Sequence, residues 1–325
     1  MKKMNRLLSI SLLGLGLTCG VQAQQAPAFP SKPIRFMVPF TAGSGTDIIA
    51  RAVGETMSKS LGQPVIIENR PGAGGTIAAS QVAKGEADGH LLLIHSSGHA
   101  LNPAIYPNLP YDTVRDLTGI TALASLPNVM VVPPGRGWKS VGDVIAAAKS
   151  KPGSLNYASA GTGSATHLNA EKFKLRAGLD AVHVPFKGTP EALSDIIGER
   201  IDWFFAPLAS ALPLIRDGKL QALAVSTPQR AAALPQVPTT LEAGVPNSDY
   251  IFWVGMIAPA AVPAAIQRRL NEEALKALAS PEVRERLSRA GADPMPMTIE
   301  AFNAFIRTEM DAAAQIAQAA NLKAQ

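Results

Sequence analysis

Two glycine-rich segments have the residue types that bind anions through the backbone. The first is Phe40-Thr41-Ala42-Gly43-Ser44-Gly45-Thr46-Asp47, and the second is Ser159-Ala160-Gly161-Thr162-Gly163-Ser164. Each lies between a short apolar run and a stretch with helical spacing. Glycine lets the backbone turn tightly, and the N-terminus of the following helix carries a partial positive charge. Each segment could therefore hold a carboxylate or phosphate through backbone N–H groups.

Neither segment matches a nucleotide-binding motif. No Gly-Lys-Ser or Gly-Lys-Thr follows the first segment, and its glycines do not have the G-x-G-x-x-G spacing. Asp47 has two interpretations that the sequence leaves open, because an aspartate here can cap the helix or contact a ligand directly.

Ser159 suggests a different class of function. Tyr157 to Gly161 resembles the nucleophile elbow of a serine hydrolase without its first glycine, and His183 follows later in the chain. The loop is longer and richer in glycine than such an elbow. An exported serine hydrolase using Ser159 and His183 is kept as the alternative to a binding protein.

Other polar residues support weaker hypotheses. His95 and His99 are four residues apart, but they flank Ser96-Ser97-Gly98 at the end of an apolar run, which argues against a helical metal site. We expect His99 and Asn102 to start a helix or to line a cleft. Arg70 could clamp a carboxylate or form a surface ion pair, and both interpretations remain open.

The elements around the two loops have the β-α-β order of a parallel sheet with helical crossovers. Ile34 to Phe40, Val65 to Ile67 and Leu91 to Ile94 are predicted strands, and helical spacing links Ile48 to Leu61. The pattern restarts at Val129 and continues to Val225. After a strand at Val254 to Ala258, everything beyond Val262 is predicted to be helical. These helices have no strands of their own, so we expect them to cover the first sheet.

The fold class that follows is α/β, with two domains, a hinge and a cleft between them. Domain 1 is predicted to be discontinuous, with residues 24–126 and 253–325, and domain 2 to span residues 127–252. The crossover segments are expected near residues 120–128 and 248–255. Ligands bind such sheets beyond the carboxyl ends of the strands, so the two loops should face each other.

The N-terminus has the features of a secretory signal peptide. Residues 1–6 are basic, Leu7 to Leu17 is apolar, and Val21-Gln22-Ala23 resembles a cleavage site. We expect cleavage near Ala23, removal of Cys19 with the signal, and a periplasmic protein without cysteine. Such a protein has no thiolate nucleophile or zinc–cysteine site.

Composition excludes further classes. The 325 residues are 47% hydrophobic and 17% charged, which suits a folded protein with a sizeable core. The formal net charge is only +5, and the basic residues beyond the signal are dispersed. A nucleic-acid partner is not expected, because such proteins concentrate basic residues on one face.

The chain resembles the solute-binding proteins of tripartite tricarboxylate transporters, the Bug family of Gram-negative periplasms. The matching segments extend in order over almost all the chain beyond the signal. They are Pro33 to Phe40 with the Ala42-Gly43 loop and Asp47, Glu68 to Gly75, Tyr157 to Ser164 with His167-Leu168, His183 to Gly188, Gly218 to Val225, and Val237 to Gly244. One departure is Ser44, which stands where many members have a second glycine.

The resemblance implies a type II periplasmic-binding fold and a monomeric receptor that performs no reaction. Its ligand would be a dicarboxylate, an acidic amino acid or an aromatic acid, with no metal or other cofactor. Its partner would be the membrane subunits of a transporter, or alternatively a membrane sensor kinase. The ligand-binding residues predicted from both lines of reasoning are Phe40, Thr41, Ala42, Gly43, Ser44, Gly45, Thr46, Asp47, Ser97, His99, Ser159, Gly161, Thr162, Gly163, Ser164, His167, Lys187, Thr189 and Ala206.

Overall fold

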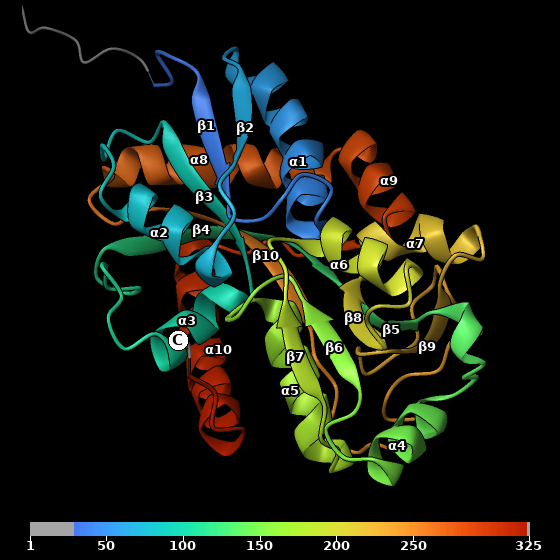
Figure 1. Cartoon of the computed structure of the whole chain (residues 1–325). Coiled ribbons are helices and arrows are strands. Elements are labelled where there is room, and N and C mark those ends of the chain that lie inside the picture. Colours follow the sequence, from blue (N-terminus) through green and yellow to red (C-terminus); the bar gives the residue numbers. More distant parts are fainter. Residues whose placement is uncertain (1–28, 324–325) are drawn as a thin grey trace, which may run out of the picture.

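The computed structural model describes residues 29–323. The predicted signal peptide, its cleavage site near Ala23 and Cys19 lie outside these residues. Two α/β lobes lie one above the other in Figure 1, each built on its own sheet.

The first sheet combines strands from both ends of the chain. Its order is β11-β4-β10-β3-β1-β2. The strand β1 pairs in parallel with β2 and β3, whereas β10 is antiparallel to β3 and β4. The strands are β1 (Ile34–Val38), β2 (Val65–Asn69), β3 (Leu91–Ser96), β4 (Leu117–Leu126), β10 (Phe252–Pro259) and β11 (Asp293–Pro294).

Six α-helices belong to this lobe among residues 29–323. They are α1 (Gly45–Leu61), α2 (Thr76–Ala83), α3 (Gly98–Ile105), α8 (Ala264–Ala279), α9 (Pro281–Arg289) and α10 (Ile299–Ala319). The predicted return of the C-terminal helices is confirmed, because α8 packs on α1 and β4 while α10 packs on β4 and α3. The prediction that everything beyond Val262 is helical is wrong at β11, where two residues pair with β4.

The second sheet has the order β7-β6-β8-β5-β9. Its strand β6 is parallel to β7 and β8, and β5 is antiparallel to β8 and β9. The strands are β5 (Asn128–Val132), β6 (Asn156–Ser159), β7 (Val182–Pro185), β8 (Trp203–Pro207) and β9 (Gln221–Val225). The helices are α4 (Val141–Ser150), α5 (Ala165–Ala177), α6 (Thr189–Ile197) and α7 (Leu208–Arg216).

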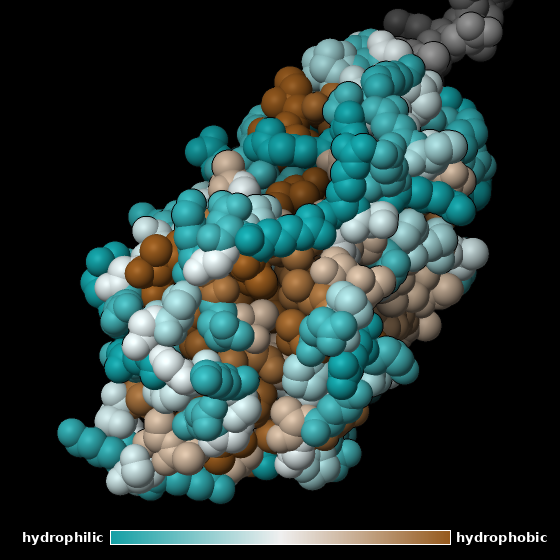
Figure 2. Space-filling view, turned by 90° about the vertical axis from the view of Figure 1, so that its right-hand side faces the viewer, coloured by the Kyte–Doolittle hydropathy of each residue, from teal (hydrophilic) through white to brown (hydrophobic). Residues whose placement is uncertain are grey.

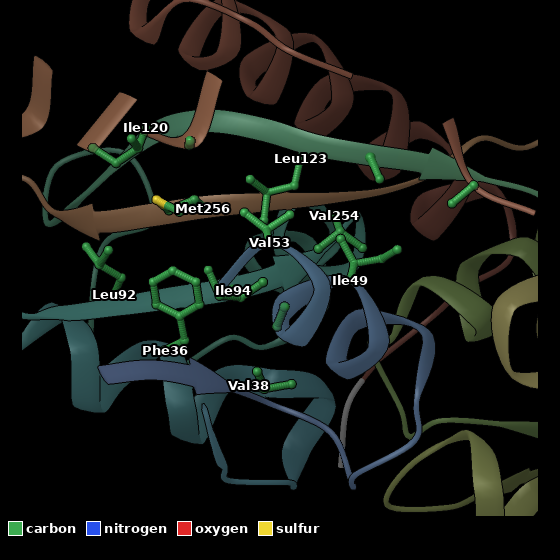
Figure 3. Close-up of a cluster of buried hydrophobic side chains, with 14 of the residues drawn as sticks. Phe36, Val38, Ile49, Val53, Leu92, Ile94, Ile120, Leu123, Val254 and Met256 are labelled. Atoms are coloured by element: carbon green, nitrogen blue, oxygen red, sulfur yellow. The ribbon is translucent and has the colours of Figure 1, made fainter. Parts of the chain in front are cut away.

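Helix α1 shows how the sequence fixes the position of the first loop. Its residues Ile49, Val53 and Met57 recur on one face and are fully buried. Figure 3 shows Ile49 and Val53 directed at the sheet, beside Val254 and Leu123. The helix ends at Gly62, which has a φ of 66° in the left-handed region that glycine tolerates best. Packing on the sheet therefore sets where the N-terminus of α1 lies.

The two connections between the lobes differ in length. Only Pro127 separates β4 from β5, so most of the expected crossover at 120–128 is strand. The second connection runs from residue 226 to residue 251. The sequence analysis missed β4, in which all ten residues are apolar, glycine or small polar residues without a clear alternation. A strand buried on both faces lacks the period-two pattern that would reveal it.

Two tryptophans lie in the hydrophobic cores of the two lobes. Trp203 stacks on Tyr157 with 4.9 Å between ring centroids, inside the second lobe. Trp253 packs against Phe302, and its indole N–H donates to Glu309 at 2.9 Å.

No described helix is long and apolar enough to cross a membrane.

Candidate functional site

The two glycine-rich loops meet at a small cavity between the lobes. The cavity volume is about 10 Å³, which is space for roughly one water molecule. The first lobe contributes Phe40, Ser44, Gly45, Thr46, Ser96 and Phe252 to the lining, and the second lobe contributes Ala160, Ser164, Ala165, Thr166, Thr189 and Pro207. No charged side chain belongs to this lining.

Four helix N-termini converge on this cavity. The lining includes the first residues of α1, α5 and α6 and the residue that precedes α7. Figure 1 shows α1 of the upper lobe directed toward the lower lobe at this level. The N-cap residues of α1, α6 and α7 do not cap their own helices through a side chain. The first N–H groups of a helix have no partner within it, so this arrangement creates a positive potential without any cation.

The Asp47 carboxylate stabilises the first loop. It accepts the Gly43 N–H at 2.9 Å, two bonds from Arg51 at 2.9 and 3.0 Å, and one from Asn69 at 2.9 Å. Burial opposes its ionisation, but the hydrogen bonds from Arg51, Gly43 and Asn69 outweigh burial and lower its pKa. The structure places Asp47 in the first turn of α1, where its oxygens are committed to the loop.

We expect Asp47→Asn to lower the free energy of unfolding by about 2 kcal/mol, because it weakens hydrogen bonds to a buried charged group. Urea unfolding at pH 7 measures this. The control is Asp217→Asn, since Asp217 is exposed and lies 3.6 Å from Lys219. The stabilisation by Asp47 is present above its unfolded-state pKa and is lost as the pH falls through the lower folded-state value. Equal unfolding midpoints for both variants would contradict the role of Asp47.

The second loop is held by its own side chains. Ser164 caps α5 by accepting the His167 N–H at 3.3 Å, and Thr166 Oγ1 accepts the Ala160 N–H at 2.9 Å. The His167 ring accepts the Gly163 N–H through Nδ1 at 3.3 Å. Gly163 has a φ of 86°, a conformation that side chains disfavour. His167 thus supports the loop from behind the cavity.

Ser159 and His183 do form a pair. Ser159 Oγ lies 2.6 Å from His183 Nε2 and also accepts the Gly161 N–H at 3.0 Å. Burial lowers the pKa of His183 to about 3, and His167, stacked at 4.0 Å, contributes to the same direction. Ser159 is fully buried and does not line the cavity. The geometry makes Ser159 a bridge between the loop and β7.

We expect Ser159→Ala to leave any background ester hydrolysis unchanged and to weaken ligand binding moderately, by roughly 10-fold, because one buried hydrogen-bond bridge is lost. A chromogenic ester assay and a thermal-shift titration measure the two effects separately. Loss of a turnover that the wild-type protein shows would instead support the hydrolase alternative, since removing a nucleophile lowers turnover by orders of magnitude.

The lobes touch directly around the cavity. Thr189 donates its N–H to Ser44 Oγ at 3.1 Å, and Ser210 donates its hydroxyl to the Gly43 carbonyl at 2.9 Å. Tyr106 donates to the Thr162 carbonyl at 2.8 Å. Thr41 donates to Glu191 at 2.9 Å. These bonds join the two loops to the opposite lobes, so this arrangement of the lobes is a closed one.

Of the predicted site residues, only Phe40, Ser44, Gly45, Thr46, Ser164 and Thr189 line the cavity. The loop residues Thr41, Ala42, Gly43, Asp47, Ser159, Gly161, Thr162, Gly163 and His167 lie outside the lining, as do four residues elsewhere in the chain. Ser97 Oγ hydrogen bonds to Tyr250 at 2.8 Å. His99 lines a separate cavity with Thr113 and Asn303. Lys187 is exposed, and Ala206 is buried in β8. Ser97, His99, Lys187 and Ala206 are therefore not among the proposed ligand contacts.

The sequence analysis missed several lining residues. Ser96 ends β3, at the same sheet edge as the first loop, so the rule that ligands bind beyond strand ends could have found it. Pro207 ends β8, which is parallel to β6, so the same rule could have found it, whereas Phe252 begins β10 and carries no such signal. The structure also places Arg70 at the surface, away from the lining. Among residues 29–323, His95 and His99 belong to no cluster of three residues that could hold a metal ion.

A larger cavity of about 590 Å³ lies at the connections between the lobes. It is lined by Leu126, Pro127, the 227–233 segment and the end of α9. Figure 2 shows the side of the molecule that carries α7 and α9, with hydrophobic surface between hydrophilic margins. The convergent helix N-termini are not at this cavity, so it lacks the feature that distinguishes the smaller one.

Comparison with known proteins agrees with the fold. BugT of Bordetella pertussis is 35% identical over 311 residues, 94% of this chain and 95% of BugT. MatC of Rhodopseudomonas palustris, solved with bound malate, is 32% identical with a TM-score of 0.85, over 89% of this chain and 99% of MatC. Rpa4515 of R. palustris, solved with adipate, is 33% identical with a TM-score of 0.88, over 91% of this chain and 99% of Rpa4515.

These similarities confirm the predicted two-domain periplasmic-binding fold with a discontinuous first domain. The structural relatives are solute-binding proteins and not enzymes, which argues against the hydrolase alternative. The description "Tripartite tricarboxylate transporter family receptor" belongs to the family model that matches residues 49–322. The chain is a member of this family of periplasmic solute-binding receptors.

Proposed function

We propose that this receptor captures one small organic carboxylate between its lobes and delivers it to a membrane transporter of the tripartite tricarboxylate type. The observation that carries the proposal is the convergence of four helix N-termini on one cavity whose lining has no charged side chain. Fixed N–H dipoles in a water-poor site suit a carboxylate, because they need no reorganisation when the anion enters.

The proposed ligand contacts divide between the lobes. Gly45 and Thr46 offer N–H groups from α1, and Ala165 and Thr166 offer them from α5. Thr189 and Ser44 lie where α6 meets the first loop. A ligand held by both sets is bound fully only when the lobes are closed, so binding shifts the population toward the closed state.

Two structural relatives support the ligand class. One was solved with adipate and the other with malate, and both are carboxylates. Export to the periplasm with cleavage near Ala23, the domain boundaries at residues 126–127 and 252–253, and a monomeric state belong to the same proposal.

The alternative function of the same site is ligand sensing, in which the protein signals to a membrane kinase. Both uses need ligand-dependent closure, and they differ in the membrane partner. Co-purification of the full-length exported protein with candidate membrane partners distinguishes them.

A thermal-shift screen tests the proposed function. Protein freed of carried-over ligand by partial unfolding and refolding is screened against mono-, di- and tricarboxylates, acidic amino acids and aromatic acids. We expect at least one acid to raise the melting temperature in a concentration-dependent way, because a ligand that binds only the folded state stabilises it. No shift with any acid, for protein that native mass spectrometry shows to be ligand-free, would overturn the proposal.

A further inference from the structure

Ser96 has a buried hydroxyl that no residue described in the structure satisfies. The residue ends β3, is fully buried, and lines the cavity between the two loops. Its Oγ has no hydrogen-bond partner, whereas its N–H donates to His95 Nδ1 at 2.8 Å. Burying a hydroxyl without a partner is costly, so an orphaned group that lines a cavity points to something that binds there.

The neighbouring serine provides a contrast. Ser97 is 2% exposed, but its hydroxyl is paired with Tyr250 at 2.8 Å. Of these two serines, Ser96 has the unpaired hydroxyl, and it is also the one that lines the cavity. Ser96 lines the cavity from the first lobe, and Ala165 and Thr166 at the N-terminus of α5 line it from the second lobe.

The size of the cavity limits which ligand atoms Ser96 can reach. At about 10 Å³, the closed space has room for roughly one water molecule, so an acid bound between the lobes would lie against both walls. If the helix N-termini hold the carboxylate, the hydroxyl of Ser96 lies within reach of the carboxylate or of a group on the adjacent carbon. The N–H groups already supply donors for the anion, whereas a serine hydroxyl can both donate and accept.

We propose that Ser96 is a specificity-determining residue that selects acids with a hydroxyl or keto group on the carbon next to the carboxylate. This inference rests on the proposed function and narrows its ligand class to 2-hydroxy and 2-oxo acids. An acid with only an alkyl group there would leave the Ser96 hydroxyl unpaired in the closed protein. Sites that hydrogen bond a ligand hydroxyl discriminate against analogues that lack it for this reason.

Matched acid pairs test the inference by calorimetric titration of ligand-free, full-length protein. The pairs are lactate and propionate, 2-hydroxybutyrate and butyrate, and malate and succinate. For the pair that binds wild-type protein best, we expect the 2-hydroxy acid to bind roughly 10- to 100-fold more tightly than its partner, as one buried hydrogen bond provides. Equal affinity within every pair would overturn the inference, even before any variant is made.

Ser96→Ala and Ser97→Ala then locate the source of the preference. Ser96→Ala should remove most of the difference within a pair by weakening the hydroxy acid alone, whereas Ser97→Ala should keep it. Equal weakening of both acids by Ser96→Ala would mean that Ser96 contacts the carboxylate, and an unchanged preference would mean that Ser96 does not contact the ligand. Either result overturns the inference. Failure of every carboxylate in the broader screen would instead overturn the proposed function.

Discussion

Gly98→Ala should prevent full closure of the lobes and weaken ligand binding by roughly 100-fold, about 2.7 kcal/mol. Gly98 is the first residue of α3, and a Cβ there would lie 2.8 Å from the Gly163 carbonyl oxygen and 3.0 Å from the Ala165 nitrogen. Those atoms belong to the backbone of the opposite lobe, so no side chain can move aside. The clash exists only when the lobes are closed, and the open protein accommodates the methyl group.

The control for Gly98→Ala is Gly142→Ala. Gly142 lies near the start of α4, and the nearest atom to its added Cβ is Ser140 Oγ at 3.4 Å. Neither variant should melt at a lower temperature than the wild-type protein without ligand, because alanine is a better helix former than glycine. Small-angle scattering measures closure, and calorimetry measures affinity. Ligand-induced compaction of Gly98→Ala equal to that of the control would show that the lobes do not close through this contact.

The second large effect is a loss of stability in mild acid. Burial lowers the pKa of His99 and of His167 to about 4, and that of His183 to about 3. Burial also lowers the pKa of His95 well below its usual value. All four are neutral in the folded protein at pH 6, whereas the unfolded chain binds protons near pH 6.5.

The sign of the effect follows from this difference in bound protons. The stabilisation is fully present above pH 6.5 and decreases as the pH falls from 6.5 toward 4, because the unfolded state takes up protons that the folded state excludes. Each histidine contributes about 1.4 kcal/mol per pH unit in that window. Burial raises the pKa of Glu309, so this carboxyl group makes folding more favourable as the pH falls. It is one group against four histidines and offsets their effect only in part.

Urea unfolding at pH 7, 6 and 5 measures this loss of stability. We expect the midpoint to fall steadily, and His167→Asn to reduce the slope by about one proton. The asparagine oxygen can still accept the Gly163 N–H, so the variant should remain folded. A midpoint that stays constant from pH 7 to pH 5 would show that these histidines are not held neutral by the fold.

The sequence was sufficient to predict both lobes and the two glycine-rich loops. Apolar positions at helical spacing, such as Ile49 and Val53, marked the helices, and the order of strands and helices implied which strand ends face the same edge. The two loops do line one cavity. Local patterns carried this information because each loop lies between a strand and a helix that are adjacent in the chain.

The rest of the site depends on contacts between distant segments. Thr189 reaches the cavity by hydrogen bonding to Ser44, which is 145 residues away. Phe252 lies at the start of β10, and Ser96 is distinguished from Ser97 only by which hydroxyl pairs with Tyr250. Contacts between such distant residues leave no periodic pattern in the sequence. The long buried strand β4 was missed for a related reason, since both of its faces are covered.

Backbone amide NMR of ligand-free protein titrated with the acid that gives the largest thermal shift tests the central claim most directly. The account predicts that the N–H resonances of Gly45, Thr46, Ala165 and Thr166 move together, and more than those of α4 or α9. A carboxamide analogue of the same acid should leave them in place. Saturable binding that leaves these four amides unchanged and instead shifts residues around the larger cavity at the lobe connections would contradict the account.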